Sequence, residues 1–161
     1  MHPRALELIG SLALLPHPEG GHYWRVYESA LRVKCADRER AASSAIHYLL
    51  IAGEISRWHR VDADESWHHA EGDPLELFVF DANTHELVRH RLGRHDVATE
   101  TNPLVVVPAH RWQAARPLGS YALVGCSVAP AFEFAGFVLL DAAPDVARLI
   151  ETAHPALTAL K

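Results

Sequence analysis

The chain has 161 residues, of which 49% are hydrophobic and 22% are charged, and its formal net charge is -5. These values predict one globular domain over residues 1–161. No apolar run reaches the ~20 residues that a membrane helix needs, so we expect no contact with a membrane. Binding to a phosphate backbone requires an excess of positive charge, and we therefore expect no nucleic-acid partner.

The two cysteines, Cys35 and Cys126, lie far apart and outside any Cys-x-x-Cys pattern. They predict neither a disulfide framework nor a thiolate metal cluster, which favours a reducing compartment. The apolar stretch near the N-terminus is interrupted by Glu7 and followed by Pro16, unlike the core of a signal peptide. We therefore expect a cytoplasmic protein.

A short helix is predicted over residues 3–15, where Pro3 suits the first turn and apolar residues recur at helical spacing. From about residue 23 to 140, short runs of β-branched and aromatic residues alternate with turn formers. The clearest strands are expected over residues 43–51, 75–80, 104–107 and 121–128. A final helix, roughly 144–153, begins with Pro144 and has one apolar face.

Many short strands without βαβ alternation predict a mainly all-β protein, an antiparallel sandwich or barrel. The two short helices flank this strand-rich core of about 23–140. We expect the second helix to pack on the outside of the sheets.

A motif between two glycines carries the most specific signal. Gly53, His59, Glu65 and Gly72 follow one another at the spacing of the first cupin signature, with Val61 at the position of a second histidine. The only candidate for the second cupin signature runs from Asn102 to Pro117, and it keeps Pro108 and places Gln113 at a ligand position. The chain thus resembles the cupin superfamily, which implies a double-stranded β-helix, or jelly-roll barrel.

More narrowly, the chain resembles a sugar-epimerase-like cupin branch catalogued as a domain of unknown function. The segments that carry this likeness are Pro16 to Gly21, Trp58 to Arg60, Asp64 to His68 and Trp112 to Gly119. Members of this branch are similar in architecture to the dTDP-sugar epimerases and are generally dimers. The resemblance therefore implies a homodimer.

The candidate metal ligands are His59, Glu65 and Gln113. A carboxamide is a poor donor for zinc, iron or nickel, so this set predicts at most weak binding of a divalent ion and no dedicated cofactor. His69 could complete the set, because it shares the face of Glu65 in a regular strand.

Without a metal, His59 and Glu65 predict a catalytic acid–base pair, since an imidazole beside a carboxylate can exchange protons near neutral pH. Five further side chains are expected to bind the ligand. Trp67 and His69 share a face with Glu65, Arg57 shares a face with His59, and Gln113 and Tyr23 offer hydrogen bonds. Trp58 points to the opposite face and is expected in the core together with Trp112.

Three functions remain open at this point. The first is an isomerase or epimerase that acts on a sugar or sugar nucleotide by proton transfer. The second is a non-catalytic dimer whose pocket senses a small molecule, with a carbohydrate as one candidate ligand. The third is a metal-dependent cupin enzyme.

Overall fold

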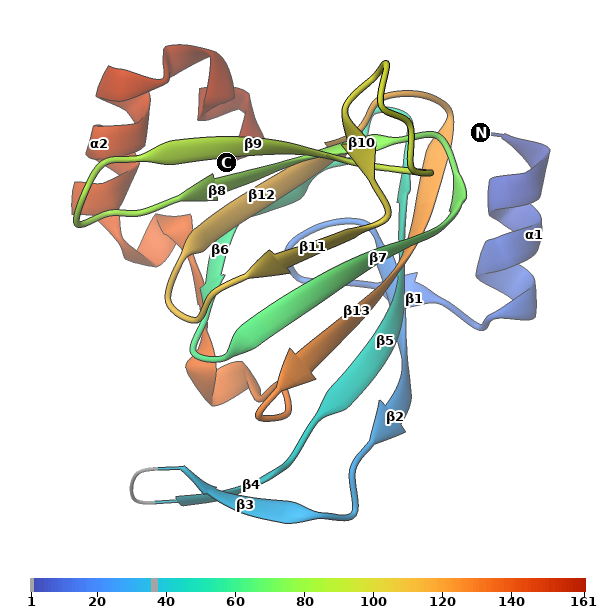
Figure 1. Ribbon diagram of the computed structural model, residues 1–161, viewed down its shortest axis with the longest axis horizontal. Helices are drawn as coiled ribbons and strands as arrows, with labels where there is room; N and C mark the ends of the chain where they lie inside the picture. Colours follow the sequence, from blue (N-terminus) through green and yellow to red (C-terminus); the bar gives the residue numbers. More distant parts are fainter. Residues whose placement is uncertain (1, 36–37) are drawn as a thin grey trace.

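Two six-stranded sheets form the body of the protein in the computed structural model, which describes residues 2–35 and 38–161 (Figure 1). The strands of the first sheet, in spatial order, are β1 (Leu15–Pro16), β2 (His22–Glu28), β5 (Ser44–Ile51), β13 (Tyr121–Ala129), β7 (Asp64–Gly72) and β11 (Leu104–Val107). Those of the second sheet are β10 (Thr101–Asn102), β9 (Leu87–Leu92), β8 (Leu75–Phe80), β12 (Trp112–Pro117), β6 (Ser56–Val61) and β14 (Phe137–Leu139). This architecture confirms the expected all-β jelly-roll.

The strand predictions agree closely with the structure. β8 and β11 begin and end where the apolar runs do, and β5 and β13 differ from the expected strands by one residue at one end. These segments are rich in β-branched and aromatic residues, which pack well on a pleated surface.

The first helix is shorter than predicted. Helix α1 spans Pro3–Ser11 and not residues 3–15. Ala13 has a left-handed backbone with φ of 53°, which turns the chain out of the helix. Leu15 and Pro16 then pair with β2 as the short strand β1.

Helices cover the outer faces of both sheets (Figure 1). Ala5 and Leu8 of α1 pack on Leu49 and Leu123 of the first sheet. Helix α2 spans Pro144–Ala153, as predicted, and covers the second sheet together with the 3-10 helices η2 (Leu140–Ala142) and η3 (Pro155–Leu160). Trp58 and Trp112 are buried in that outer core, as the sequence indicates. A further 3-10 helix, η1, spans Phe134–Gly136.

No helix within the described ranges is both long and apolar enough to cross a membrane.

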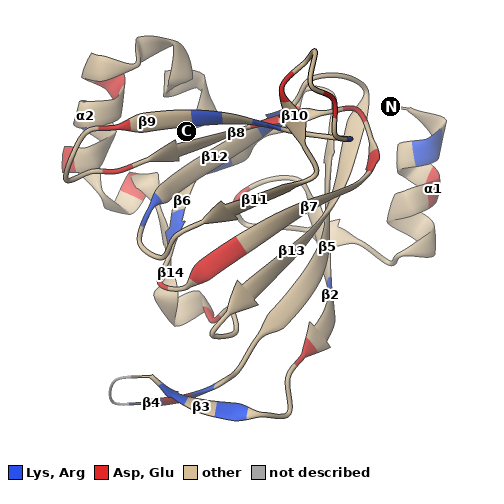
Figure 2. Cartoon of the chain, in the orientation of Figure 1, with Lys and Arg blue, Asp and Glu red and all other residues tan. Residues whose placement is uncertain are grey.

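The space between the sheets is packed at one end and open at the other. Along β13, Ala122 and Val124 belong to the core, Cys126 borders both core and cavity, and Val128 lines the cavity. A hairpin of β3 (Arg32–Cys35) and β4 (Arg38–Ala41) extends from the body below this open end (Figure 1). Several basic residues lie on this hairpin (Figure 2). The β7 strand begins with two acidic residues, Asp64 and Glu65 (Figure 2).

Candidate functional site

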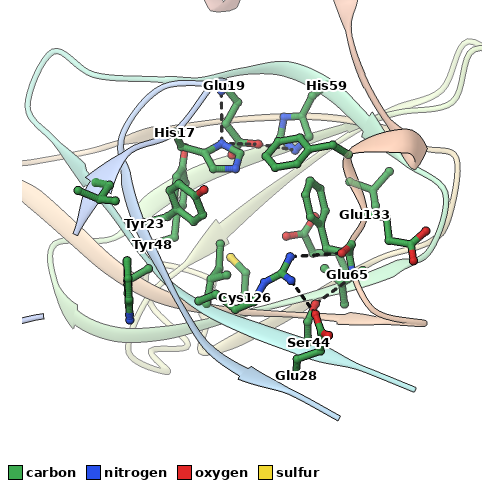
Figure 3. Close-up of a pocket in the computed structure, with 18 residues that line it drawn as sticks. His17, Glu19, Tyr23, Glu28, Ser44, Tyr48, His59, Glu65, Cys126 and Glu133 are labelled. Atoms are coloured by element: carbon green, nitrogen blue, oxygen red, sulfur yellow. Dashed lines mark hydrogen bonds and ion pairs between the residues drawn. The ribbon is translucent and has the colours of Figure 1, made fainter. Parts of the chain in front are cut away.

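A cavity of about 510 Å³ opens between the two sheets. This volume lies within the range of about 300–1,000 Å³ that is typical of small-molecule sites. The lining side chains come from β1, from the loop between β1 and β2, from β2, β5, β6, β7 and β13, and from the segment after β13 (Figure 3). They are Leu15, His17, Glu19, Tyr23, Trp24, Arg25, Glu28, Ser44, Ile46, Tyr48, His59, Val61, Glu65, Cys126, Val128, Phe132, Glu133 and Phe134.

A glycine pair brings the loop before β2 against the sheets. Gly20 and Gly21 have φ values of 108° and 67°, which L residues other than glycine rarely adopt. A Cβ at Gly20 would overlap the carbonyl oxygen of Ile55, and one at Gly21 would lie 2.8 Å from that of Leu49. The absence of side chains at both positions therefore lets the loop lie close enough to place Glu19 inside the cavity.

Glu19 lies between two histidines (Figure 3). Its Oε2 atom is 3.3 Å from Nε2 of His59 and 3.4 Å from Nδ1 of His17. Its Oε1 atom accepts a hydrogen bond of 2.9 Å from the hydroxyl of Ser56. Only 6% of Glu19 and 1% of His59 is exposed, so the three ionisable groups meet in a nearly dry environment.

The proton positions in this cluster follow from its contacts. Nδ1 of His59 lies 2.7 Å from the carbonyl oxygen of Arg57, which can only accept, so Nδ1 carries a proton. Burial lowers the pKa of His59 and of His17, and burial raises the pKa of Glu19. A neutral His59 therefore presents a free electron pair at Nε2 to the carboxyl group of Glu19.

Glu65 is the second buried carboxyl group of the cavity. Burial raises its pKa to about 7, although the neighbouring His59 opposes part of this rise. The amide nitrogen of Gln113 donates a hydrogen bond of 2.6 Å to Oε2 of Glu65. Nε1 of Trp67 in turn donates to Oε1 of Gln113 at 3.1 Å. Trp67 and Gln113 thus hold the carboxyl group of Glu65 in place from behind.

The structure brings three of the predicted site residues to the cavity, namely His59, Glu65 and Tyr23. Trp67 and Gln113 do not line it; they lie in the core behind Glu65, at about 1% exposure each. The strand alternation placed Trp67 correctly on the inner face, but this part of the interior is filled with side chains.

Arg57 and His69 also lie away from the cavity. The guanidinium of Arg57 donates to the carbonyl oxygen of Pro18 at 2.7 Å, and its backbone N–H donates to that of Glu19 at 2.8 Å. Arg57 therefore fastens the loop that carries Glu19. His69 is half-buried where β7 meets the segment before β11, and its backbone N–H donates to Pro103.

His17 and Glu19 are site residues that sequence reasoning did not assign. The segment from Pro16 to Gly21 carried a signal, because it marks the resemblance to the cupin branch and ends in two glycines. Whether this segment directs Glu19 into the cavity depends on the close approach of Gly20 to Ile55, which is a contact between segments distant in the sequence.

The proposed weak metal set does not fit the structure. The indole N–H of Trp67 can only donate, so the carbonyl oxygen of Gln113 faces Trp67 and its amide N–H faces Glu65. An amide nitrogen that donates a hydrogen bond is not a metal ligand. Within residues 2–35 and 38–161, no group of three or more His, Cys, Asp or Glu side chains is arranged to hold a metal ion.

Two mainly antiparallel sheets that enclose a pocket at one end define a cupin-type protein. The family model described as the cupin superfamily, domain of unknown function 985, matches residues 6–140. The chain belongs to this family. Comparison with curated proteins gives no significant match.

Solved structures agree with this assignment. A protein from Shewanella oneidensis is 31% identical, with a TM-score of 0.80 over 96% of this chain and 92% of that one. A hypothetical protein from Leishmania major is 27% identical, with a TM-score of 0.79 over 92% of this chain and 97% of that one. The oxalate decarboxylase of Bacillus subtilis is 13% identical, with a TM-score of 0.58 over 87% of this chain and 34% of that one, a likeness of fold alone.

Proposed function

We propose that this cupin is an acid–base enzyme that moves a proton on a small polar molecule, as isomerases and epimerases do, with sugars as the first candidate class. The observation that carries the proposal is the contact between Glu19 and His59 beside Glu65 in one cavity. Two buried carboxyl groups and an imidazole can supply both a base and an acid.

The roles follow from the protonation states. Glu65, with a pKa of about 7, is partly ionised at neutral pH and can take a proton from a carbon next to a carbonyl group. The electron pair of the broken C–H bond moves to the carbonyl oxygen and forms an enolate. Glu19, whose pKa is raised by burial, provides a proton to that oxygen either directly or through Nε2 of His59. A proton then returns to carbon while a hydroxyl proton goes back to Glu19, so the carbonyl group forms again and the isomerisation or epimerisation is complete without any oxidant.

Aromatic side chains support a sugar as the substrate class. Tyr23, Tyr48, Phe132 and Phe134 line the cavity, and their rings can pack on the C–H face of a sugar. The hydroxyl of Tyr48 donates to the carbonyl oxygen of Gly20 at 2.8 Å, so its ring is held in position.

The test is solvent exchange. Candidate aldoses and ketoses are incubated with the protein in deuterated water, and loss of the proton next to the carbonyl is followed by NMR. We expect exchange with the native protein and a loss of about 100-fold or more in Glu65→Gln and His59→Asn. Glu86→Gln, which alters an exposed carboxylate in the β8–β9 turn, is the matched control and should exchange normally.

Binding without exchange would contradict this function and would favour a sensor. If a sugar bound to the cavity, and His59→Asn and Glu65→Gln only weakened that binding, a non-catalytic ligand-sensing role would replace the enzyme.

We also infer that the protein forms a homodimer through β2. Strand β1 pairs only with His22 and Tyr23, and in the described part of the chain the rest of the outer edge of β2 has no neighbour. Val26 and Tyr27 are about half exposed on this strand. An uncovered apolar edge favours pairing with a second chain. Tyr27→Lys should therefore change the sedimentation of the protein from that of a dimer to that of a monomer. If the native protein itself sedimented as a monomer, the inference would be refuted.

A further inference from the structure

The lining of the cavity has more acidic side chains than lysines and arginines. Four carboxylate side chains line it, and they are Glu19, Glu28, Glu65 and Glu133. Among the described lining residues, Arg25 is the only lysine or arginine. A site for a phosphate or carboxylate group normally offers arginine, lysine or several free backbone N–H groups.

Arg25 is already engaged with protein acceptors. Its Nη1 atom donates to Oε2 of Glu28 at 2.6 Å, and its Nη2 atom donates to the carbonyl oxygen of Phe132 at 3.3 Å. Glu133 is paired with Arg38, which does not line the cavity, at 3.1 Å. The charges of Glu28 and Glu133 are therefore compensated by arginines of the protein, and the described lining residues offer no unpaired guanidinium to an anionic ligand.

The floor of the cavity does not provide a cation either. Nδ1 of His59 is bound to the carbonyl oxygen of Arg57, and Nδ1 of His17 accepts the backbone N–H of Glu19 at 3.3 Å. A negatively charged ligand would meet Glu65, which lines the cavity and is partly ionised at neutral pH, in a poorly solvated space where like charges repel strongly. A ligand with an amine would instead compensate the charge of Glu65.

The walls add an apolar surface. Leu15, Val61, Val128 and Phe134 line the cavity, together with the tyrosine and tryptophan rings of β2. Such rings attract cations as well as apolar faces.

We propose that the cavity takes a small molecule that is uncharged or positively charged and has an apolar face, and that it excludes phosphorylated and nucleotide-bearing molecules. This inference deepens the proposed function, on which it rests for the use of the cavity, and it narrows the substrate class from sugars and sugar nucleotides to free sugars, amino sugars or related amines.

The experiment measures binding to the full chain with probes that share one skeleton. Tyramine, tyrosol and 4-hydroxyphenylacetate carry an amine, an alcohol and a carboxylate on the same phenol, and thymidine diphosphate represents the nucleotide class. NMR shifts of labelled protein give the dissociation constants and locate the site. We expect tyramine and tyrosol to bind in the cavity at least about tenfold more tightly than 4-hydroxyphenylacetate, with no binding of thymidine diphosphate.

One variant tests the cause directly. Glu28→Gln removes the carboxylate partner of Arg25, so it should raise the affinity for 4-hydroxyphenylacetate and leave that for tyrosol nearly unchanged. Glu86→Gln, which is remote from the cavity, should alter neither affinity.

Three results would overturn the proposal: preference for the carboxylate probe, binding of thymidine diphosphate in the cavity, or no binding of tyramine and tyrosol. The outcome is separate from that of the exchange experiment, since binding requires no turnover. If the probes bound in the expected order but no sugar exchanged its proton, the acid–base function would be refuted and the charge preference of the cavity would be supported.

Discussion

Nε2 of His59 lies 3.3 Å from Oε2 of Glu19, although one residue comes from β6 and the other from the loop before β2. The same carboxyl oxygen approaches His17 at 3.4 Å, so Glu19 connects two imidazoles. Glu65 completes the cluster, because its charge and that of His59 influence each other. Protons in such a cluster belong to the group of residues and not to one side chain.

Replacement of Glu19 tests the centre of this cluster. Glu19→Gln keeps the size of the side chain and can still bond to Ser56, but an amide cannot release a proton to His59. We expect proton exchange in the substrate to fall about 100-fold, with little change in the denaturant midpoint. Normal exchange in Glu19→Gln would show that Glu19 only supports the loop.

The ionisation of Glu65 should make stability depend on pH. Because its pKa is about 7 in the folded protein and ordinarily 4.5, the folded state binds this proton more tightly than the unfolded state. The stability linked to Glu65 is therefore full below about pH 4.5 and is lost as pH rises through 7. Glu65→Gln should gain about 2 kcal/mol relative to the native protein between pH 5 and pH 8.

Urea unfolding of both proteins at the two pH values checks this expectation. The free-energy difference between variant and native protein at pH 5 is subtracted from that at pH 8, which cancels any cost of the substitution that does not depend on pH. Equal differences in unfolding free energy at pH 5 and pH 8 would mean that Glu65 ionises normally.

Two variants can separate the effects of the hydrogen bond from Trp67 to Gln113 and of that from Gln113 to Glu65. Gln113→Leu removes the partner of both Glu65 and Trp67, so it should cost roughly 1–3 kcal/mol for each buried group left unpaired. It should also raise the pKa of Glu65 further, since the hydrogen bond from Gln113 lowers that pKa.

Trp67→Phe is the matched control for Gln113→Leu. It removes the indole donor but keeps the hydrogen bond from Gln113 to Glu65, so it should reduce stability and leave the pKa of Glu65 nearly unchanged. Carboxyl carbon NMR titration measures this pKa in both variants. A similar shift in the two variants would assign the effect to general loosening of the core.

Gly20 should be far less tolerant of substitution than Gly53. Both have positive φ values, but an added Cβ at Gly20 would overlap the carbonyl oxygen of Ile55, whereas one at Gly53 would have no atom within 4 Å. Gly53→Ala should therefore cost about 1 kcal/mol from backbone strain alone. Gly20→Ala should cost more and should also abolish tyramine binding, because the loop that carries Glu19 must move.

Denaturant unfolding and the tyramine titration together check this pair. Similar losses of stability in Gly20→Ala and Gly53→Ala, with binding retained, would show that the loop does not need its close approach to Ile55.

Much of the fold could be predicted because it depends on local patterns. The β8 and β11 strands are short apolar runs between turn formers, and helix α2 begins at Pro144 with one apolar face. The end of α1 was predicted wrongly, since its apolar spacing continues after Ser11 while the backbone turns at Ala13. That turn is coupled to the pairing of β1 with β2, which no local window contains.

The sequence by itself determined that His59 and Glu65 lie on inner faces of their strands, because side chains alternate along a strand and the cupin spacing marks both positions. Only the tertiary structure decided that Glu19 joins them, and that Trp67 and Gln113 stand behind Glu65 and not in the cavity. The physical reason is that alternation decides to which face of a sheet a side chain points. Whether that face borders a cavity or packed core depends on contacts between distant segments. The approach of Gly20 to Ile55 is one such contact.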